Sequence, residues 1–308
     1  AEQADDIWVS TFHSTCVRIL RRNIESLGYS RSFTIYDGDD QKTLMREIIK
    51  FLNLDPKKYK ERTFMNAISS AKDELVSPEE YEKMAMGDHQ KELYARAYRE
   101  YERRLHDANA LDFDDLICKT VQLFKENPDI LEYYQNRFKY IMVDEYQDTN
   151  TAQFRLIHLL ASTKGDNGET LHNLCVVGDD DQSIYKFRGA NIKNILNFEN
   201  SYPETEVIKL EENYRSTQNI LDAANAVIKN NQVRKDKALW TQHEKGDLIY
   251  LSQFDSDYDE ASSIAAAIAA VTRSGQADYK DFAILYRTNA QSRIFEEKLV
   301  TNNIPYRI

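Results

Sequence analysis

The sequence is poor in cysteine and has no apolar run long enough to cross a membrane. Its three cysteines, Cys16, Cys118 and Cys175, are far apart among 308 residues and form no Cys-x-x-Cys pair. This spacing argues against a disulfide framework and against a zinc site, and it fits a reducing cytoplasm. No apolar stretch approaches the roughly 20 residues that a membrane-spanning helix needs, so we expect no membrane partner.

An excess of positive charge is also absent. The chain has 40 Lys and Arg against 51 Asp and Glu, which gives a formal net charge of -11. Nucleic-acid-binding domains often carry a basic surface, so this balance counts against such a function. It does not exclude one, because bulk charge describes the whole surface, whereas a binding groove needs only local charge and aromatic side chains.

Apolar periodicity predicts an α/β protein with an all-helical interruption. We expect strands at residues 7–10, 139–144, 173–177, 206–210, 248–252 and 281–286, with helices between most of them. Residues 39 to about 110 carry helical patterns only. This stretch is therefore expected to form an inserted helical subdomain.

The strand predicted at residues 139–144 ends in two adjacent carboxylates, Asp144 and Glu145. Ligands of α/β proteins bind outside the carboxyl ends of the strands. One carboxylate at such an edge can hold Mg²⁺, and the second can act on a water molecule, as triphosphate hydrolysis requires. The same residues also suit an ordinary helix start with acidic first-turn side chains, so this segment alone leaves both interpretations open.

A second polar segment follows the strand predicted at residues 173–177. It contains a glycine, three aspartates and Gln182, whose amide can orient a water or sense a γ-phosphate. Tyr185, Phe187 and Arg188 then bring two aromatic rings and a guanidinium together, and bases stack on such groups for about 1–3 kcal/mol each. The alternative is that both aromatic residues belong to the core.

Two further segments carry weaker signals. Arg215 lies where one α/β unit gives way to the next, and an arginine there can reach a phosphate across a cleft. It is equally consistent with a surface arginine beside a helix-capping Ser216. Phe12 and His13 follow the first predicted strand and can stack on a base or hold a phosphate, although a lone histidine is more often structural.

Together these segments resemble one family, the UvrD/Rep/PcrA-type DNA helicases of superfamily one. Residues 143–150, Val-Asp-Glu-Tyr-Gln-Asp-Thr-Asn, are similar to the Walker B motif of that family. Residues 176–190 resemble its motif that couples ATP to single-stranded DNA, and residues 210–217 resemble the motif at the junction of its two motor domains. Further segments fit in the same order, at residues 11–14, 111–116 and 285–293.

The resemblance implies a fold and a domain organisation. The fold would be a RecA-like P-loop NTPase motor domain with an inserted all-α subdomain, followed by part of a second RecA-like domain. The first motor domain would comprise residues 1–38 and 111–210, interrupted by the helical subdomain at 39–110. The incomplete second domain would comprise residues 211–308.

The resemblance also implies an ATP-dependent DNA helicase, with ATP and Mg²⁺ bound by particular residues. Asp144 would bind Mg²⁺, Glu145 would be the general base for the attacking water, and Gln182 would sense the γ-phosphate. Tyr214 would stack near the nucleotide base, and Arg215 would act as an arginine finger.

The partners implied by the resemblance are single-stranded DNA and its junctions with duplex DNA. The residues that would contact DNA are Phe12, His13, Tyr185, Phe187, Arg188, Arg287 and Asn289. Tryptophan is common in the family at the position of Phe187, so a smaller stacking face is expected there.

One motif of this family is missing, because no Gly-x-x-x-x-Gly-Lys-Ser/Thr occurs in the sequence. The resemblance places this phosphate-binding loop upstream of Ala1 and the later motifs beyond Ile308, so we expect the chain to be an internal fragment. Without the N–H groups and the lysine of that loop, a triphosphate is not fixed, and we expect no ATP hydrolysis by the chain alone. An incomplete sheet also exposes edges or apolar surface, which favours self-association.

Two other functions stay open at this point. The first is an ATP-independent module that binds single-stranded DNA, whose affinity would weaken with salt. The second is a Mg²⁺-dependent nuclease that uses Asp144, Glu145 and the aspartates at 179–181 in a two-metal site. The strand-end position of these carboxylates and the presence of Gln182 fit a triphosphatase better.

Overall fold

The computed structural model describes residues 7–164, 170–232, 234–235 and 237–308. The chain forms two compact units. Unit 1 comprises Ala1–Glu211 and Ala226–Ala238, and unit 2 comprises Glu212–Asn225 and Leu239–Ile308. Among the described residues, no helix combines the length and the apolar character that spanning a bilayer requires.

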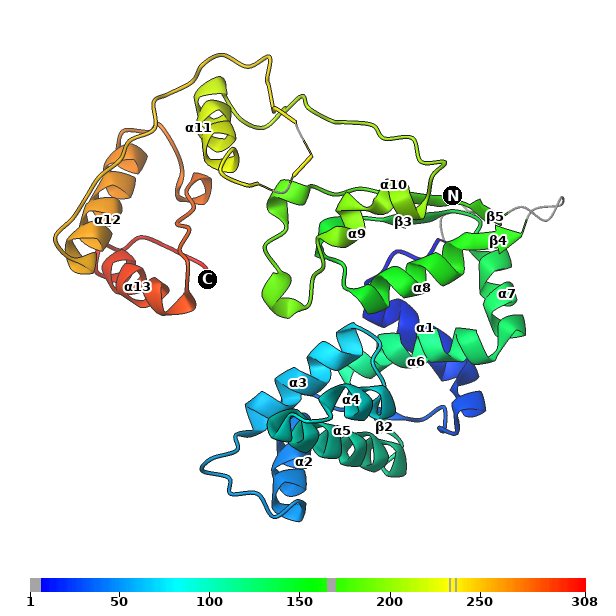
Figure 1. Ribbon diagram of the computed structural model, residues 1–308. Coiled ribbons are helices and arrows are strands. Elements are labelled where there is room, and N and C mark those ends of the chain that lie inside the picture. Colours follow the sequence, from blue (N-terminus) through cyan, green and yellow to red (C-terminus); the bar gives the residue numbers. More distant parts are fainter. Residues whose placement is uncertain (1–6, 165–169, 233, 236) are drawn as a thin grey trace. The chain divides into compact units, whose positions relative to one another are not determined.

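Helices surround short strands in unit 1 (Figure 1). Its helices are α1 (Phe12–Asn23), α2 (Gly38–Phe51), α3 (Glu61–Asp73), α4 (Pro78–Ala85), α5 (His89–Asp107), α6 (Phe113–Glu126), α7 (Pro128–Arg137), α8 (Thr151–Ala161), α9 (Lys193–Leu196) and α10 (Phe198–Ser201). Its strands are β1 (Thr34–Ile35), β2 (Ala110–Leu111), β3 (Ile141–Val143), β4 (Ser162–Lys164), β5 (Thr170–His172) and β6 (Leu174–Val176). The remaining α-helices are α11 (Gln218–Ile228), most of which belongs to unit 2, and α12 (Asp257–Arg273) and α13 (Ser292–Thr301) of unit 2.

Two parallel strand pairs organise unit 1. β1 pairs with β2, so the chain leaves for helices α2 to α5 and returns from them at neighbouring points. β3 pairs with β6, and this pair positions the candidate site. The third pair, β4–β5, is antiparallel, with Ser162 opposite His172.

Helix boundaries follow from side-chain caps. Asp112 accepts the N–H of Asp115 at the start of α6, and Asp115 accepts the N–H of Asp112 in return. Asn150 and Gln153 form the same reciprocal arrangement at the start of α8. Such capping boxes satisfy backbone donors that a helix leaves without intrahelical partners. With these caps, α6 spans Phe113–Glu126.

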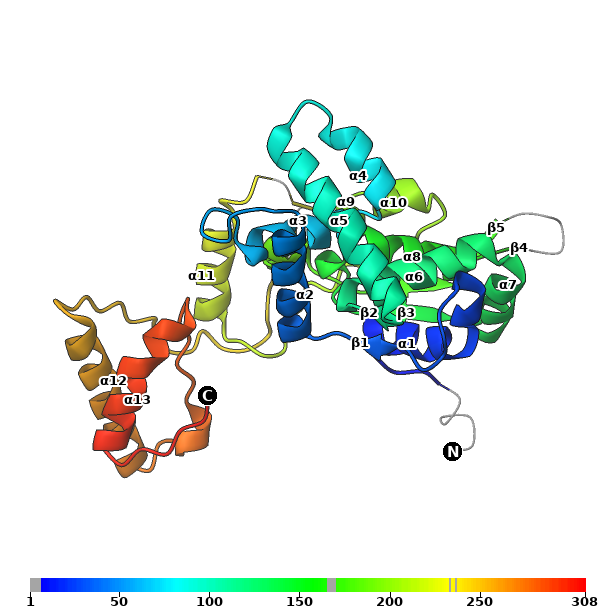
Figure 2. The ribbon, with the colours of Figure 1, turned by 90° about the horizontal axis from the view of Figure 1, so that it is seen from below.

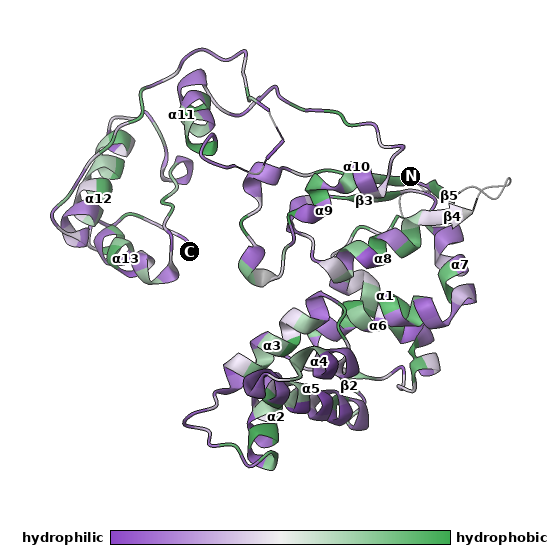
Figure 3. Cartoon of the chain, in the orientation of Figure 1, coloured by the Kyte–Doolittle hydropathy of each residue, from purple (hydrophilic) through white to green (hydrophobic). Residues whose placement is uncertain are grey.

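The described part of unit 1 has separate apolar clusters for its two groups of helices. Residues of α1, α6 and α8, among them Leu20, Leu116 and Leu156, form one cluster. Residues of α2, α3 and α5 form another, with Met45 and Phe64 inside it. Figure 2 shows α1 close to α6, and Figure 3 shows hydrophilic residues over much of α5 and hydrophobic residues along α8.

A buried ion network joins the two groups of helices. Lys72 of α3 is 2% exposed, and its Nζ lies 2.7 Å from Glu102 Oε1, 2.8 Å from Asp112 Oδ2 and 2.8 Å from Asp115 Oδ1. Burial alone would lower the pKa of Lys72, but the neighbouring carboxylates outweigh it and raise that pKa. Because α3 and α5 supply Lys72 and Glu102 while α6 begins at the two aspartates, the network connects the inserted helices to the core of unit 1.

Four predicted strands are wrong. Residues 7–10, 206–210, 248–252 and 281–286 form no strand in the structure. A strand needs backbone donors and acceptors on a neighbouring segment, whereas an apolar pattern reports only the side chains. Several apolar side chains of these segments are exposed, including Leu251 at 97% and Leu210 at 80%.

Candidate functional site

The carboxyl ends of β3 and β6 bring the two polar segments of unit 1 together. The strands are parallel, with Val143 opposite Val176. Beyond the last paired residues, Val177 donates its N–H to the carbonyl of Val143 at 2.8 Å, and Tyr146 donates its N–H to the carbonyl of Val177 at 2.9 Å. Asp144 therefore leaves the sheet at the same edge as the loop that begins at residue 178.

Glu145 occupies an unusual backbone conformation at this edge. Its φ of 50° and ψ of 42° lie in the left-handed region, and its N–H donates to Asp144 Oδ1 at 2.9 Å. Non-glycine residues held in that region tend to cluster at functional sites. Asp144 and Glu145 are both exposed, so their carboxylates are accessible to a ligand.

Gln147 links the two segments, a role that the sequence pattern did not indicate. Gln147 is buried, with 1% of its surface exposed. Nε2 donates to Glu145 Oε2 at 2.7 Å, while Oε1 accepts the N–H of Asp179 at 2.9 Å. The only signal in the sequence was an amide inside the acidic run that follows β3.

Gly178 makes this close approach possible. A Cβ at this position would lie 2.6 Å from Gln147 Oε1 and 2.9 Å from Ile195 Cδ1. Both separations are shorter than carbon atoms tolerate, so any larger residue would displace the amide that joins the segments.

Gln182 is the last residue of the hydrogen-bonded network at this edge. It ends the short 3₁₀ helix Asp180–Gln182, and its Nε2 donates to Asp179 Oδ2 at 2.6 Å. A continuous hydrogen-bonded chain thus runs from Glu145 through Gln147 and Asp179 to Gln182. The two residues suggested for water activation and phosphate sensing belong to one network.

The three aspartates at 179–181 are close enough to hold a metal ion, but cations of the chain engage them. Their ligand atoms all lie within 4.8 Å of one another. Lys237 Nζ contacts Asp179 and Asp180, and it lies 3.4 Å from Asp181 Oδ2. Arg234 Nη2 donates to the same oxygen of Asp181 at 2.8 Å.

The candidate DNA-binding residues of unit 1 differ in accessibility. Phe12 packs partly against the core, and the His13 ring contacts the edge of Phe113 with centroids 5.8 Å apart. Burial lowers the pKa of His13. Tyr185 and Phe187 are 39% and 76% exposed, and their ring centroids are 6.0 Å apart. They form the more open aromatic surface.

Arg188 ends the short 3₁₀ helix Lys186–Arg188, but its side chain lies outside the described part of the chain. The following residue, Gly189, has a φ of 85°. A Cβ there would lie 2.0 Å from Asp73 Oδ2, so the backbone of this loop runs directly against a carboxylate of α3. Asp73 in turn accepts a hydrogen bond from Asn150 Nδ2 at 2.6 Å, and burial raises the pKa of Asp73 to about 7.

The remaining candidate residues belong to unit 2 and are exposed. Asn213 Oδ1 accepts the N–H groups of Arg215 and Ser216, at 3.0 and 2.8 Å, and so shapes the turn before α11. The Tyr214 hydroxyl donates to Glu212 Oε2 at 2.8 Å, which raises the pKa of Tyr214.

Arg287 and Asn289 lie beside the capping box that Thr288 forms with Gln291. Arg287 donates its N–H to Gln291 Oε1 at 2.9 Å, so its backbone is fixed while its side chain is exposed.

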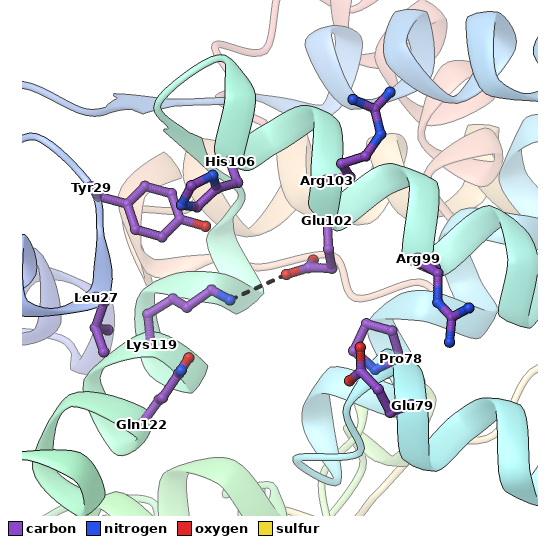
Figure 4. Close-up of a pocket in the computed structure, with 10 residues that line it drawn as sticks. All are labelled: Leu27, Tyr29, Pro78, Glu79, Arg99, Glu102, Arg103, His106, Lys119 and Gln122. Carbon is purple, nitrogen blue, oxygen red and sulfur yellow. Dashed lines mark hydrogen bonds and ion pairs between the residues drawn. The ribbon is translucent and has the colours of Figure 1, made fainter.

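A cavity of about 360 Å³ lies in unit 1 away from this sheet edge, and none of the predicted site residues lines it (Figure 4). Its cationic side chains already have acidic partners. Lys119 Nζ lies 3.3 Å from Glu102 Oε2, and Arg103 Nη2 lies 2.8 Å from Glu100 Oε1. These pairs leave little unbalanced charge for a ligand, so the edge of β3 and β6 is the better candidate site.

Comparison with known proteins extends over both units. A family model described as the UvrD/REP helicase N-terminal domain matches residues 1–203, and one described as the UvrD-like helicase C-terminal domain matches residues 208–308. Over 305 residues the chain is 52% identical to proteins named ATP-dependent DNA helicase PcrA from Staphylococcus epidermidis and Staphylococcus aureus. These matches cover 99% of this chain but 41% and 40% of the two relatives, so the chain spans about two-fifths of their length.

Proposed function

The chain belongs to the UvrD/Rep helicase family, and from this we propose that it is the part of an ATP-dependent DNA helicase that contains the hydrolytic carboxylates and a single-strand-binding surface. The fold of the family is RecA-like α/β, in keeping with the parallel strands and surrounding helices of unit 1. The intact protein would move along single-stranded DNA and unwind duplex DNA at junctions. Free cysteines fit our further proposal of a cytoplasmic location.

One observation carries the proposal for the chemistry. The hydrogen-bonded chain from Glu145 to Gln182 joins the two segments at one sheet edge. Ligands of α/β proteins bind at such edges. A triphosphate and a water placed there would meet both a carboxylate and an amide, which is the pairing that hydrolysis of a γ-phosphate requires.

The residues present fit a magnesium ion with ATP. Asp144 is exposed at the sheet edge and offers the carboxylate oxygen that Mg²⁺ prefers. When bound, the ion would neutralise charge on the phosphate oxygens. Glu145 would accept the proton of the attacking water, and Gln182 would orient that water or the γ-phosphate.

Unit 2 would supply the remaining groups for the nucleotide. We assign Arg215 the part of an arginine finger, since a guanidinium gives two parallel hydrogen bonds to phosphate oxygens. Tyr214 would stack near the nucleotide base.

DNA contacts would come from both units. Tyr185 and Phe187 would stack on bases, and Arg188, the next residue in sequence, would also contact the DNA. Phe12 and His13, at the start of α1, would contact it as well. In unit 2, Arg287 and Asn289 would contact the phosphodiester backbone of the DNA. We further propose the domain limits 1–38 with 111–210, 39–110, and 211–308.

The nuclease alternative receives less support. A two-metal site needs carboxylates that are free to coordinate two ions. Lys237 and Arg234 engage the aspartates at 179–181 in ion pairs, so a metal would have to displace both cations. The binding-module alternative agrees with what we expect of the isolated chain, since binding to Tyr185 and Phe187 needs no nucleotide.

We expect the purified chain to bind oligothymidylate weakly and to hydrolyse no ATP. Its 308 residues contain no phosphate-binding Gly-x-x-x-x-Gly-Lys-Ser/Thr loop, so the triphosphate has no cradle. Fluorescence anisotropy with labelled oligothymidylate at increasing salt measures the first expectation, and phosphate release with and without DNA measures the second. Affinity should fall as salt rises, because phosphate contacts release counterions.

The comparison with blunt duplex of equal length is the control. Tighter binding to the duplex, or no binding to the single strand even at low salt, would contradict the assignment of the aromatic surface. DNA-stimulated phosphate release would contradict the expectation that the chain alone hydrolyses no ATP.

We also propose that the chain self-associates, because apolar residues such as Leu251 and Leu285 are exposed. Sedimentation of the same sample measures this self-association.

A further inference from the structure

A basic segment from the second half of the sequence belongs to unit 1. The chain passes into unit 2 at Glu212, returns to unit 1 for Ala226–Ala238, and enters unit 2 again at Leu239. The returning stretch includes Arg234, Lys235 and Lys237. All three contact acidic residues of unit 1.

The contacts of this segment converge on the turn that contains Gln182. Lys237 Nζ forms ion pairs with Asp179 and Asp180. The backbone N–H of Lys235 donates to Asp180 Oδ2 at 2.7 Å, and Arg234 holds Asp181. Each of the three aspartates therefore has a partner on the returning segment.

The two oxygens of Asp179 have different partners. Oδ1 accepts hydrogen bonds from Lys237 Nζ and from the N–H of Asp181, the latter at 3.0 Å. Oδ2 receives Gln182 Nε2 at 2.6 Å. Because a carboxylate is planar and rigid, fixing Oδ1 also fixes the direction of Oδ2, and with it the amide of Gln182.

Electrostatics favour the same arrangement. Three adjacent carboxylates repel one another, and a partly buried cation among them relieves that repulsion. Burial would raise the pKa of Asp179, but the bonds from Lys237 and Gln182 outweigh it and lower that pKa. Without Lys237, Asp179 would lose the cationic partner that orients its carboxylate.

We propose that Lys237 is a positioning residue that acts through Asp179 to hold the side-chain amide of Gln182 in place. The inference rests on the proposed function for its significance, since Gln182 is proposed to sense the γ-phosphate. Lys237 is far in sequence from both β3 and β6. It lies on a segment that is flanked on both sides by residues of unit 2.

The test observes Gln182 directly, without ATP or DNA. The chain is labelled with ¹⁵N-glutamine, and the side-chain NH₂ signal of Gln182 is assigned from its loss in Gln182→Leu. In Lys237→Met, which keeps the aliphatic stem and removes the ammonium group, we expect that signal to move toward the position of a solvent-exposed glutamine. Lys237→Arg should restore most of the wild-type position, because it keeps the charge.

Lys235→Met is the matched control. Lys235 lies on the same segment, but its Nζ pairs with Glu199 and not with Asp179. It should leave the Gln182 signal unchanged even if the melting temperature falls. An unmoved Gln182 signal in folded Lys237→Met, or equal shifts in both methionine variants, would overturn the proposal.

Asp179→Asn provides a second route if Lys237→Met does not fold. It keeps an oxygen near Gln182 and removes the ion pair, so we expect the Gln182 signal to move, and an unchanged signal contradicts the inference. The outcome is independent of the proposed function. If the signal responds as expected but oligothymidylate does not bind to the wild-type chain, the DNA function fails while the positioning role stands.

Discussion

Replacing Lys72 with methionine is expected to lower the free energy of unfolding of the chain by about 3–5 kcal/mol, the usual cost of removing one partner from a buried ion network. The Lys72 side chain is 2% exposed, and its ammonium group lies within 2.8 Å of oxygens on Glu102, Asp112 and Asp115. Methionine fills a similar volume, so the loss is mainly electrostatic. The buried carboxylates of Asp112 and Asp115 and the partly buried carboxylate of Glu102 would remain with much less compensation.

Urea unfolding followed by circular dichroism measures this effect. Lys42→Met is the control, because Lys42 pairs with Asp39 at 2.9 Å on the surface, and exposed pairs typically contribute about 1 kcal/mol or less. Equal unfolding midpoints for wild type and Lys72→Met would mean that the network does not join the inserted helices to the core as described.

Alanine at Tyr185 or Phe187 is expected to weaken binding of oligothymidylate by about 1–3 kcal/mol per lost stacking contact. That range corresponds to roughly 5- to 150-fold in the dissociation constant. Phe187 is 76% exposed and its ring lies near that of Tyr185, so the two can receive successive bases. Anisotropy titrations at one fixed salt concentration provide the measurement.

Tyr140→Ala is the matched control for this surface. Tyr140 is 83% exposed, but it precedes β3 and so lies at the opposite end of that strand from Asp144. We expect its removal to leave the affinity within a factor of about two, as for a surface residue that touches no ligand. A loss as large as that of Phe187→Ala would place the DNA elsewhere on unit 1.

Short-range features of the fold could be predicted from the sequence. The bounds of α6 follow from its apolar period and from Asp112 and Asp115, which cap it reciprocally. The shared edge of β3 and β6 follows from two apolar runs that each end in carboxylates. In these places local residues decide the local structure.

Features that depend on distant partners could not be predicted. The sequence pattern does not indicate the hydrogen-bond partners of Gln147. The fold shows that its amide joins Glu145 to Asp179. The contact of Lys237 with Asp179 joins residues 58 positions apart. The segments at 248–252 and 281–286 have strand-like patterns but no strand pairing, because an alternating pattern does not specify a partner.

The most direct test of the whole account places this chain in a complete motor. We would replace the matching stretch of PcrA from Staphylococcus aureus, to which the chain is 52% identical, and measure ATP turnover with and without single-stranded DNA. We expect DNA-stimulated hydrolysis by the chimera, with kcat about 10²–10⁴-fold lower in its Glu145→Gln variant and DNA affinity retained. A folded chimera whose turnover is indifferent to Glu145→Gln would contradict the assignment of this sheet edge as the site of hydrolysis.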